Sequence, residues 1–242
     1  MVYALLILSL AALYGFQRND VRNFRRFREI EDSSVRRRQF LRWAAKACAM
    51  FLGVPVAGLA ILGRLDALWS FPREFWEVGM EMPQFDTGGA MTGAAIGAVI
   101  GGAILGAFIA IRRGKPVRQP KGLDIAPMLP RNRAELLHLV PLVVNAGISE
   151  EIFFRIYLPL LLMLAGADGW IAFGASALIF GVLHRYQGWL GVLMTAALGG
   201  VFTMLYLGSG GLLLPVLFHV LINANALLFR PAVQWRFSRR AD

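Results

Sequence analysis

The sequence has few of the residues that redox centres and soluble surfaces require. It contains one cysteine, Cys48, and three histidines among its 242 residues. A single thiol excludes an intrachain disulfide and a cysteine-based metal cluster, and it argues against redox chemistry. Charged residues make up only 17% of the chain against 57% hydrophobic residues, and they gather between long apolar runs. This distribution excludes a soluble globular domain and indicates an integral membrane protein.

Acidic residues are also scarce, with 15 Asp and Glu against 25 Lys and Arg, which gives a net charge of +10. In a membrane protein such a balance is expected from loops that stay in the cytoplasm, so we expect no nucleic-acid partner. Arginine and lysine cluster in segments 17–42 and 112–133 and in the tail from residue 230, whereas the acidic residues of 64–86 lie between the basic segments. The pattern predicts a cytoplasmic C-terminus and resembles that of prokaryotic plasma-membrane proteins.

Long apolar runs predict the fold. A hydrocarbon core of about 30 Å needs about 20 apolar residues per helix. Six stretches meet or approach that length, which predicts an all-α, polytopic transmembrane helix bundle. They are Leu41–Gly63, Gly88–Ile111, Leu136–Ala165, Trp170–Leu183, Trp189–Leu207 and Leu212–Phe229. A shorter stretch, Val2–Phe16, is a weaker seventh candidate and is interpreted as an anchor. Pro141 and Pro159 predict that the third stretch tilts, kinks or divides.

The second stretch has a further pattern of small residues. Gly89, Gly93, Gly97 and Gly101 recur every four residues. Small residues on one face let helix backbones approach closely, either in a homo-oligomer or within one chain. We favour packing within the chain and leave oligomerisation open. No longer repeat is present, so the sequence does not support an inverted-repeat transporter.

Ionisable and amide side chains interrupt the apolar C-terminal half. A charged group inside a membrane costs about 2.5 to 3.5 kcal/mol on insertion scales and is by default a candidate functional site. The candidates are Glu150, Glu151, Arg155, His184, His219 and Asn223. On a helix, Glu151 and Arg155 are one turn apart and are expected to pair, whereas Glu150 points about 100° away.

The unpaired carboxylate and the imidazoles suit hydrolysis. A free Glu150 can take a proton from water and later pass it to a leaving group. His219 and Asn223 share a helix face, and Phe180 lies one turn before His184, where its ring can hold the imidazole. Such a set can activate water and stabilise an oxyanion, or bind a divalent metal.

Three motifs in a fixed order resemble those of a known family. EEIFFR at 150–155 fits EExxxR, FGVLH at 180–184 fits FxxxH, and HVLIN at 219–223 fits HxxxN. Their order and spacing resemble the CAAX-protease and bacteriocin-processing family (CPBP, or Abi) of intramembrane endopeptidases, over residues 136–229. The resemblance implies a glutamate-type protease that hydrolyses membrane-associated or prenylated, CAAX-type substrates.

The resemblance also implies roles for single residues. Glu150 is expected to be the general base that activates water, with His184 as its partner. His219 and Asn223 are expected to stabilise the tetrahedral oxyanion. The remaining motif residues are expected to support the site structurally; they are Glu151, Arg155 and Phe180.

The candidate residues also allow other mechanisms and other functions. Glu150, His184 and His219 could hold Zn²⁺, but no HExxH motif is present and the glutamate mechanism needs no metal, so we expect no cofactor. A serine mechanism is disfavoured because Ser149 has no GxSG context, and no GxGD motif indicates an aspartyl protease. The alternative function is a non-proteolytic membrane scaffold or bacteriocin-immunity protein; a proton-coupled transporter is a weaker third.

The motifs also predict a division of the chain. Residues 1–134 are expected to form an N-terminal membrane region with basic cytoplasmic loops and the glycine-rich helix. Residues 135–230 are expected to form the catalytic helical core, and 231–242 a basic cytoplasmic tail.

Overall fold

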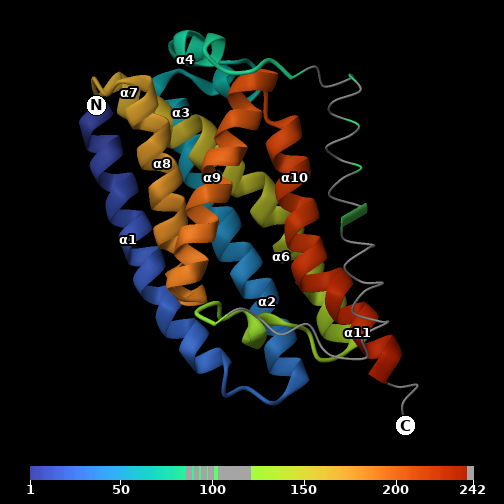
Figure 1. Cartoon of the computed structure of the whole chain (residues 1–242). Helices are drawn as coiled ribbons and strands as arrows, with labels where there is room; N and C mark the ends of the chain where they lie inside the picture. Colours follow the sequence, from blue (N-terminus) through green and yellow to red (C-terminus); the bar gives the residue numbers. More distant parts are fainter. Residues whose placement is uncertain (86–88, 90–92, 94–96, 98–100, 103–120, 239–242) are drawn as a thin grey trace.

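Long helices packed side by side along one direction make up the structure, a computed structural model that describes residues 1–85, 89, 93, 97, 101–102 and 121–238 (Figure 1). The described helices are α1 (Val2–Phe27), α2 (Ser33–Cys48), α3 (Val54–Leu62), α4 (Trp76–Met80), α6 (Arg133–Glu151), α7 (Leu158–Leu164), α8 (Gly169–Leu183), α9 (Trp189–Ser209), α10 (Leu213–Ala224) and α11 (Arg230–Ser238). No strand occurs among the described residues. The predicted all-α class is confirmed.

Within the described residues, four continuous helices are long and apolar enough to cross a membrane. They are Ser33–Leu62, Arg133–Leu164, Trp189–Ser209 and Leu213–Val233. Each overlaps a predicted span, and together they make the chain an integral membrane protein. The α8 helix coincides with predicted span Trp170–Leu183, but its 15 residues are too few for it to count as a candidate. Its crossing of the membrane stays a prediction.

Two other predicted spans also remain open. Val2–Phe16 lies within α1, which has 26 residues and is not among the four candidates. Gly88–Ile111 lies outside the described residues apart from single positions, and its packing through Gly89, Gly93, Gly97 and Gly101 therefore stays a prediction.

The arginine-rich segment 17–42, which separates two predicted spans, is mostly helical. The α1 helix continues to Phe27 and α2 begins at Ser33. Arginine is a good helix former, and hydropathy marks only the apolar part of a helix. The sequence pattern therefore ended the first helix too early, at Phe16, and began the second too late, at Leu41. The Asp32 carboxylate caps α2 by accepting from the backbone N–H groups of residues 34 and 35, at 2.6 and 3.3 Å.

In the part of the chain that the structure describes, three π-helical segments widen the long helices, and each ends two residues before a proline. They are Ala49–Gly53 before Pro55, Ile152–Tyr157 before Pro159, and Asn225–Phe229 before Pro231. Proline has no N–H to donate to the carbonyl four residues back, and its ring crowds that carbonyl, so the preceding turn opens. The run predicted to tilt, kink or divide at its prolines is one continuous helix, Arg133–Leu164, with this wide turn near its middle.

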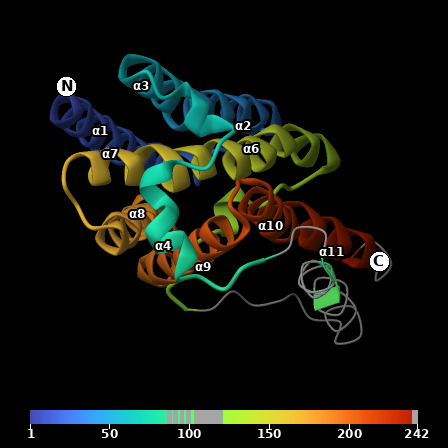
Figure 2. The same cartoon turned by 90° about the horizontal axis from the view of Figure 1, so that it is seen from above.

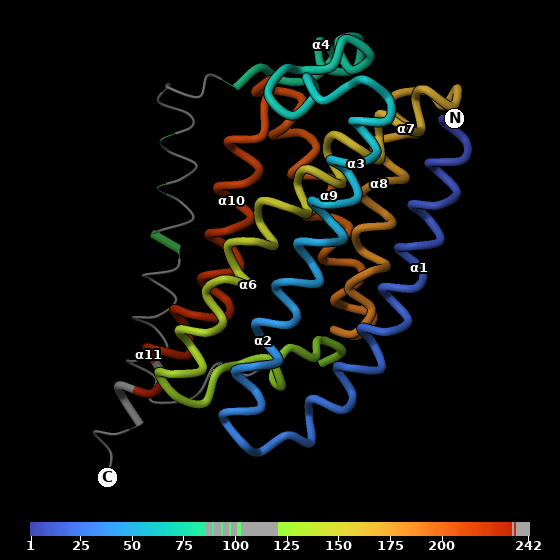
Figure 3. Tube along the Cα trace, turned by 180° about the vertical axis from the view of Figure 1, so that it is seen from behind, coloured from blue at the N-terminus to red at the C-terminus, as the bar shows by residue number. Residues whose placement is uncertain are grey.

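The helix formed by α6 and α7 is central to the packing. The α6 part contacts α2 and α10, α7 contacts α1 and α8, and α8 packs along α9 (Figures 2 and 3). A Cβ atom placed on Gly147 of α6 would lie 3.0 Å from the backbone nitrogen of Val220 in α10. Glycine therefore allows the closest approach of these two helices, directly beside the candidate residues Glu150 and His219.

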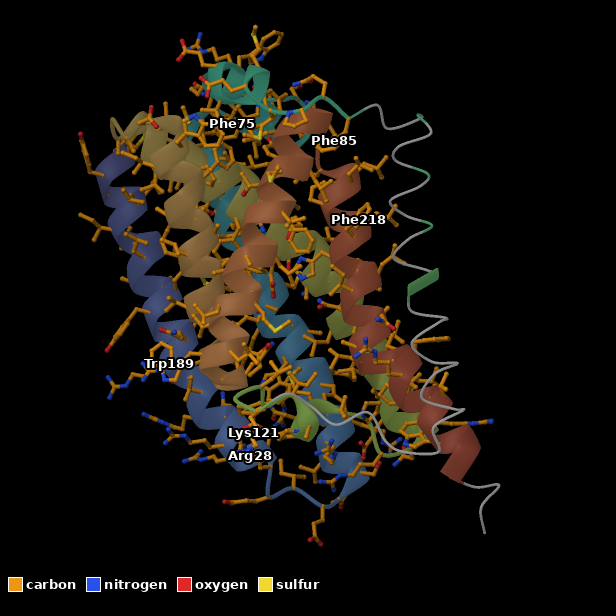
Figure 4. The ribbon with its side chains drawn as sticks, viewed as in Figure 1. Arg28, Phe75, Phe85, Lys121, Trp189 and Phe218 are labelled. Atoms are coloured by element: carbon orange, nitrogen blue, oxygen red, sulfur yellow. The ribbon has the colours of Figure 1, made fainter. Side chains whose placement is uncertain are left out.

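Residues 64–85 close one end of the bundle. The short α4 helix lies across the ends of the long helices, and Phe75 points into them, whereas Arg28 and Lys121 mark the opposite end (Figure 4). The Arg64 guanidinium donates two hydrogen bonds to the Glu74 carboxylate, at 2.6 and 2.9 Å. These bonds hold the pKa of the Glu74 carboxyl below its usual value. The segment is thus an ordered cap.

A buried ion pair joins the beginnings of α2 and α6 at the other end. Arg36 and Glu135 are both fully buried, with the Arg36 Nε atom 3.1 Å from the Glu135 Oε2 atom. Arg36 also donates to the carbonyls of Pro127 and Leu129, at 3.0 and 3.2 Å. Its guanidinium lies 4.3 Å from the centre of the Phe27 ring. The Arg36 side chain therefore holds together the beginning of α2, the beginning of α6 and residues 127–129.

Replacing Arg36 with methionine is expected to lower the free energy of unfolding by about 3 to 5 kcal/mol, because Glu135 would be left charged and buried. Thermal unfolding in detergent would measure the loss. The double variant Arg36→Met, Glu135→Leu should regain part of it, since no unpaired charge remains. Equal losses in the single and double variants would contradict this explanation.

Candidate functional site

The candidate site begins with a buried ion pair on the helix of α6 and α7. The Arg155 Nε atom donates to the Glu151 Oε2 atom at 2.8 Å, and both side chains are fully buried. The predicted pairing one turn apart is confirmed. The Arg155 guanidinium also lies over two aromatic rings, 5.3 Å from the centre of Phe180 and 5.7 Å from that of Phe202. The cation is thereby held in one position.

His219 stands between the two glutamates. Its Nδ1–H group donates to the Glu151 Oε1 atom at 2.7 Å, and its Nε2 atom lies 3.8 Å from the Glu150 Oε2 atom. The imidazole is only 4% exposed. Since Glu151 fixes Nδ1, the opposite nitrogen faces Glu150 and the cavity beside it. Glu151 therefore orients an imidazole in addition to neutralising Arg155.

His184 follows the last turn of α8. Its Nδ1–H group donates to the Phe180 carbonyl oxygen at 2.8 Å, one turn back. The Phe180 ring packs edge-on against the imidazole, with centroids 4.8 Å apart, as the spacing predicts. A carbonyl only accepts, so this bond assigns the Nδ1 proton and leaves Nε2 of a neutral His184 as a free acceptor.

A cavity of about 240 Å³ connects the candidate residues. Glu150, His184, His219 and Asn223 all line it, and Asn223 lies one turn after His219 on α10. The Glu150 carboxylate is 9% exposed, and its Oε2 atom has no hydrogen-bond partner among the described residues. The structure thus brings together a carboxylate oxygen without a hydrogen bond, two imidazoles and an amide, which come from α6, the end of α8 and α10.

These residues do not fit a metal centre in this arrangement. Within the described part of the chain, no group of three or more His, Cys, Asp or Glu side chains is placed to hold a metal ion. The set considered for Zn²⁺, which is Glu150, His184 and His219, shares a cavity without converging on one point. We therefore derive no step through a metal.

Two neighbours of the site escaped the sequence patterns. The Phe202 ring stacks on the His219 imidazole, with centroids 5.0 Å apart and an angle of 18° between the planes. Nothing in the sequence separates this phenylalanine from the other 16. Asp20 of α1 lines a second cavity together with Glu150. Asp20 is the one acidic residue among the arginines of segment 17–28, and this was the sequence feature that could have drawn attention to it.

A close helix contact positions His184. A Cβ atom placed on Gly181 would lie 2.7 Å from the Val192 carbonyl oxygen and 2.9 Å from the Ala196 nitrogen. Both are backbone atoms of α9, so Gly181→Ala must push α8 and α9 apart. We expect kcat to fall about 10- to 100-fold, because small displacements of catalytic groups are costly. Gly174→Ala is the matched control, since a Cβ atom at that α8 position meets no atom within 4 Å. Equal activity of both variants would contradict the assignment.

Comparison with known proteins identifies one family. Residues 132–225 match the family model described as type II CAAX prenyl endopeptidase Rce1-like. The match contains all three motifs, from Glu150 to Asn223, and covers α6 to α10. No curated protein and no solved structure gives a significant match. Residues 132–225 are therefore a domain of the Rce1-like type II CAAX prenyl endopeptidase family, a family of glutamate intramembrane proteases.

Proposed function

We propose that this protein is an intramembrane endopeptidase that hydrolyses peptide bonds of membrane-associated or prenylated, CAAX-type substrates. The observation that carries the proposal is the single cavity of about 240 Å³ lined by Glu150, His184, His219 and Asn223. It offers a shielded volume in which water and a substrate carbonyl can meet a base and hydrogen-bond donors.

Glu150 is the general base of this proposal. Its Oε2 atom is buried and unpartnered among the described side chains, so it is available to take a proton from a water molecule. The free Nε2 atom of His184 accepts the second hydrogen of the same water and orients it. The water oxygen then forms a bond to the carbonyl carbon, and the electron pair of the C=O double bond moves to oxygen. The protonated Glu150 later gives its proton to the nitrogen as the C–N bond breaks.

His219 and Asn223 stabilise the negative oxygen of that intermediate. Glu151 holds Nδ1 of His219, so a protonated imidazole presents its Nε2–H group to the cavity. The Asn223 amide supplies a second donor from the same helix. Glu151 and Arg155 are positioning residues, since they act through His219.

Charge distribution supports an orientation. The end of the bundle that carries Arg28 and Lys121 gathers side-chain nitrogen atoms (Figure 4). Positive charge is retained in the cytoplasm, so we propose that this end and the C-terminus lie on the cytoplasmic side of a prokaryotic plasma membrane. The proposed division into an N-terminal region (1–134), a catalytic core (135–230) and a tail (231–242) would leave the four candidate catalytic residues in the core, whereas Leu123, Ile125 and Met128 of the N-terminal region complete the cavity wall.

Cleavage of quenched-fluorescent peptides by the purified protein tests the proposal. Farnesylated and unmodified peptides are compared, each with and without a zinc chelator, and the Glu150→Ala variant serves as the negative control. We expect the wild-type protein to cleave peptides in the presence of the chelator and the Glu150→Ala variant to cleave none. Folded wild-type protein that cleaves no peptide would favour a scaffold or immunity function, and cleavage lost on chelation would require a metal.

A further inference from the structure

Two further cavities lie beside the one that contains the candidate catalytic residues. An inner cavity of about 70 Å³ is lined by both of these residues and by Asp20, Trp43 and Phe51. An outer cavity of about 360 Å³ between α1 and α2 shares Asp20 and Trp43 with it. The two cavities therefore adjoin, and together they lead from the gap between α1 and α2 to the candidate catalytic groups.

Two polar groups on this route have no partner. The Trp43 side chain is 7% exposed, and its Nε1 atom is buried without a hydrogen bond inside the described structure. Asp20 is half-buried, and no hydrogen bond or ion pair to it is found among residues 1–85 and 121–238. The Lys46 ammonium interacts with the Asp20 carboxyl only through its charge, lines the outer cavity and is itself exposed. A donor and an acceptor thus belong to side chains that line the same passage.

We propose that the substrate peptide reaches Glu150 between α1 and α2 and that Trp43 and Asp20 bind its backbone or side chains there. The inference rests on the proposed function. Trp43 Nε1–H donates to a carbonyl oxygen of the peptide, and the Asp20 carboxylate accepts from an amide N–H or a cationic side chain. The scissile bond then lies where the two cavity systems meet, between Glu150 and His184.

The chemistry of the walls favours a peptide over a hydrocarbon chain in this passage. Phe16, Phe24 and Phe51 suit either occupant. A hydrocarbon, however, would displace water from Trp43 and Asp20 and leave both groups unsatisfied, which is unfavourable in an apolar site. A peptide satisfies both groups and still contacts the phenylalanine rings. The polar groups therefore decide between the two occupants.

Blocking the gap with a chemical label tests the route. Ala49 lines the outer cavity and is exposed, so Ala49→Cys, in a Cys48→Ala background, can be modified with a bulky maleimide. Ile61→Cys is the matched control, because this exposed position on the same continuous helix lines none of the three cavities. We expect modification at residue 49 to abolish peptide cleavage and modification at residue 61 to leave it unchanged. Unchanged cleavage after full labelling of residue 49 would overturn the route.

Substitution of the two polar groups tests the contacts. Trp43→Phe keeps an aromatic ring but removes the donor, and Asp20→Asn removes the charge. We expect each to raise KM about 3- to 10-fold with kcat within about 2-fold, because a binding hydrogen bond is lost without change to the catalytic groups. A fall in kcat with unchanged KM, in protein with wild-type thermal unfolding, would contradict a binding role.

Photocrosslinking separates this inference from the proposed function. The probe is a non-cleavable peptide that carries a benzophenone group, and the protein is the inactive Glu150→Gln variant. Crosslinks to α1 and α2 that disappear when residue 49 is labelled are expected. A farnesyl photoprobe that labels these helices while the peptide does not would assign the passage to hydrocarbon. Cleavage by wild type together with peptide crosslinks elsewhere would refute the route alone, whereas absent cleavage would refute the function.

Discussion

Glutamine in place of Glu150 is expected to lower kcat about 10²- to 10⁴-fold, the range that a general base contributes. The amide has nearly the same size and shape as the carboxyl but cannot accept a proton from water. The Nε2 atom of His219 lies 3.8 Å from the Glu150 Oε2 atom, and this Oε2 atom makes no hydrogen bond in the described structure. Folding should therefore be little affected. Single-turnover cleavage of a quenched peptide would measure the chemical step.

Glu150→Asp is the matched control for this variant. It keeps a carboxylate and shortens the side chain by one methylene, so we expect a smaller loss of kcat than in Glu150→Gln. Thermal unfolding of both variants should stay close to that of wild type. Full activity of the Glu150→Gln protein would contradict the role of Glu150 as general base and would favour the scaffold function.

The same substitution one residue later should lower stability as well as activity. Glu151→Gln is expected to lower the free energy of unfolding by about 3 to 5 kcal/mol, because it leaves the fully buried Arg155 guanidinium without a counter-charge. It also weakens the acceptor of the 2.7 Å bond from His219. Denaturant or thermal unfolding in detergent would report the loss. Activity should fall with it.

The double variant Glu151→Gln, Arg155→Met distinguishes the two effects. With the cation removed as well, stability should partly return, since no uncompensated charge remains in the core. Activity should stay low, because His219 would still lack its carboxylate acceptor. A double variant that regained both stability and full activity would show that Glu151 serves only as the counter-charge of Arg155.

The local chemistry of the site was predictable where it depends on spacing along one helix. Glu151 and Arg155 are four residues apart, as are Phe180 and His184, and both contacts form as expected. The apolar runs likewise located the cores of the four candidate spans. These features follow from the helical period, which a sequence displays directly.

Contacts between helices were not predictable in the same way. The bond from His219 to Glu151 joins residues 68 positions apart, and the stacking of Phe202 on His219 depends on how α9 and α10 pack. The cavity walls from α1 and α2 lie outside the part that matches the family. Trp43 and Asp20 carry no motif, so only packing shows that they approach Glu150. Helix ends were missed because arginines extend helices beyond their apolar part.

The wide turn at Ile152–Tyr157 has a consequence for how sequence change can act on this protein. A π-helical turn holds one residue more than an α-helical turn, so it offsets the two halves of a helix by about 100°. Glu150 and Glu151 precede the turn, and the apolar α7 follows it. The extra residue of the turn therefore sets the direction in which the two glutamates point, relative to the face of α7 that packs in the bundle. Deleting a single residue from the turn would leave an ordinary helix, yet it would rotate the site away from its cavity.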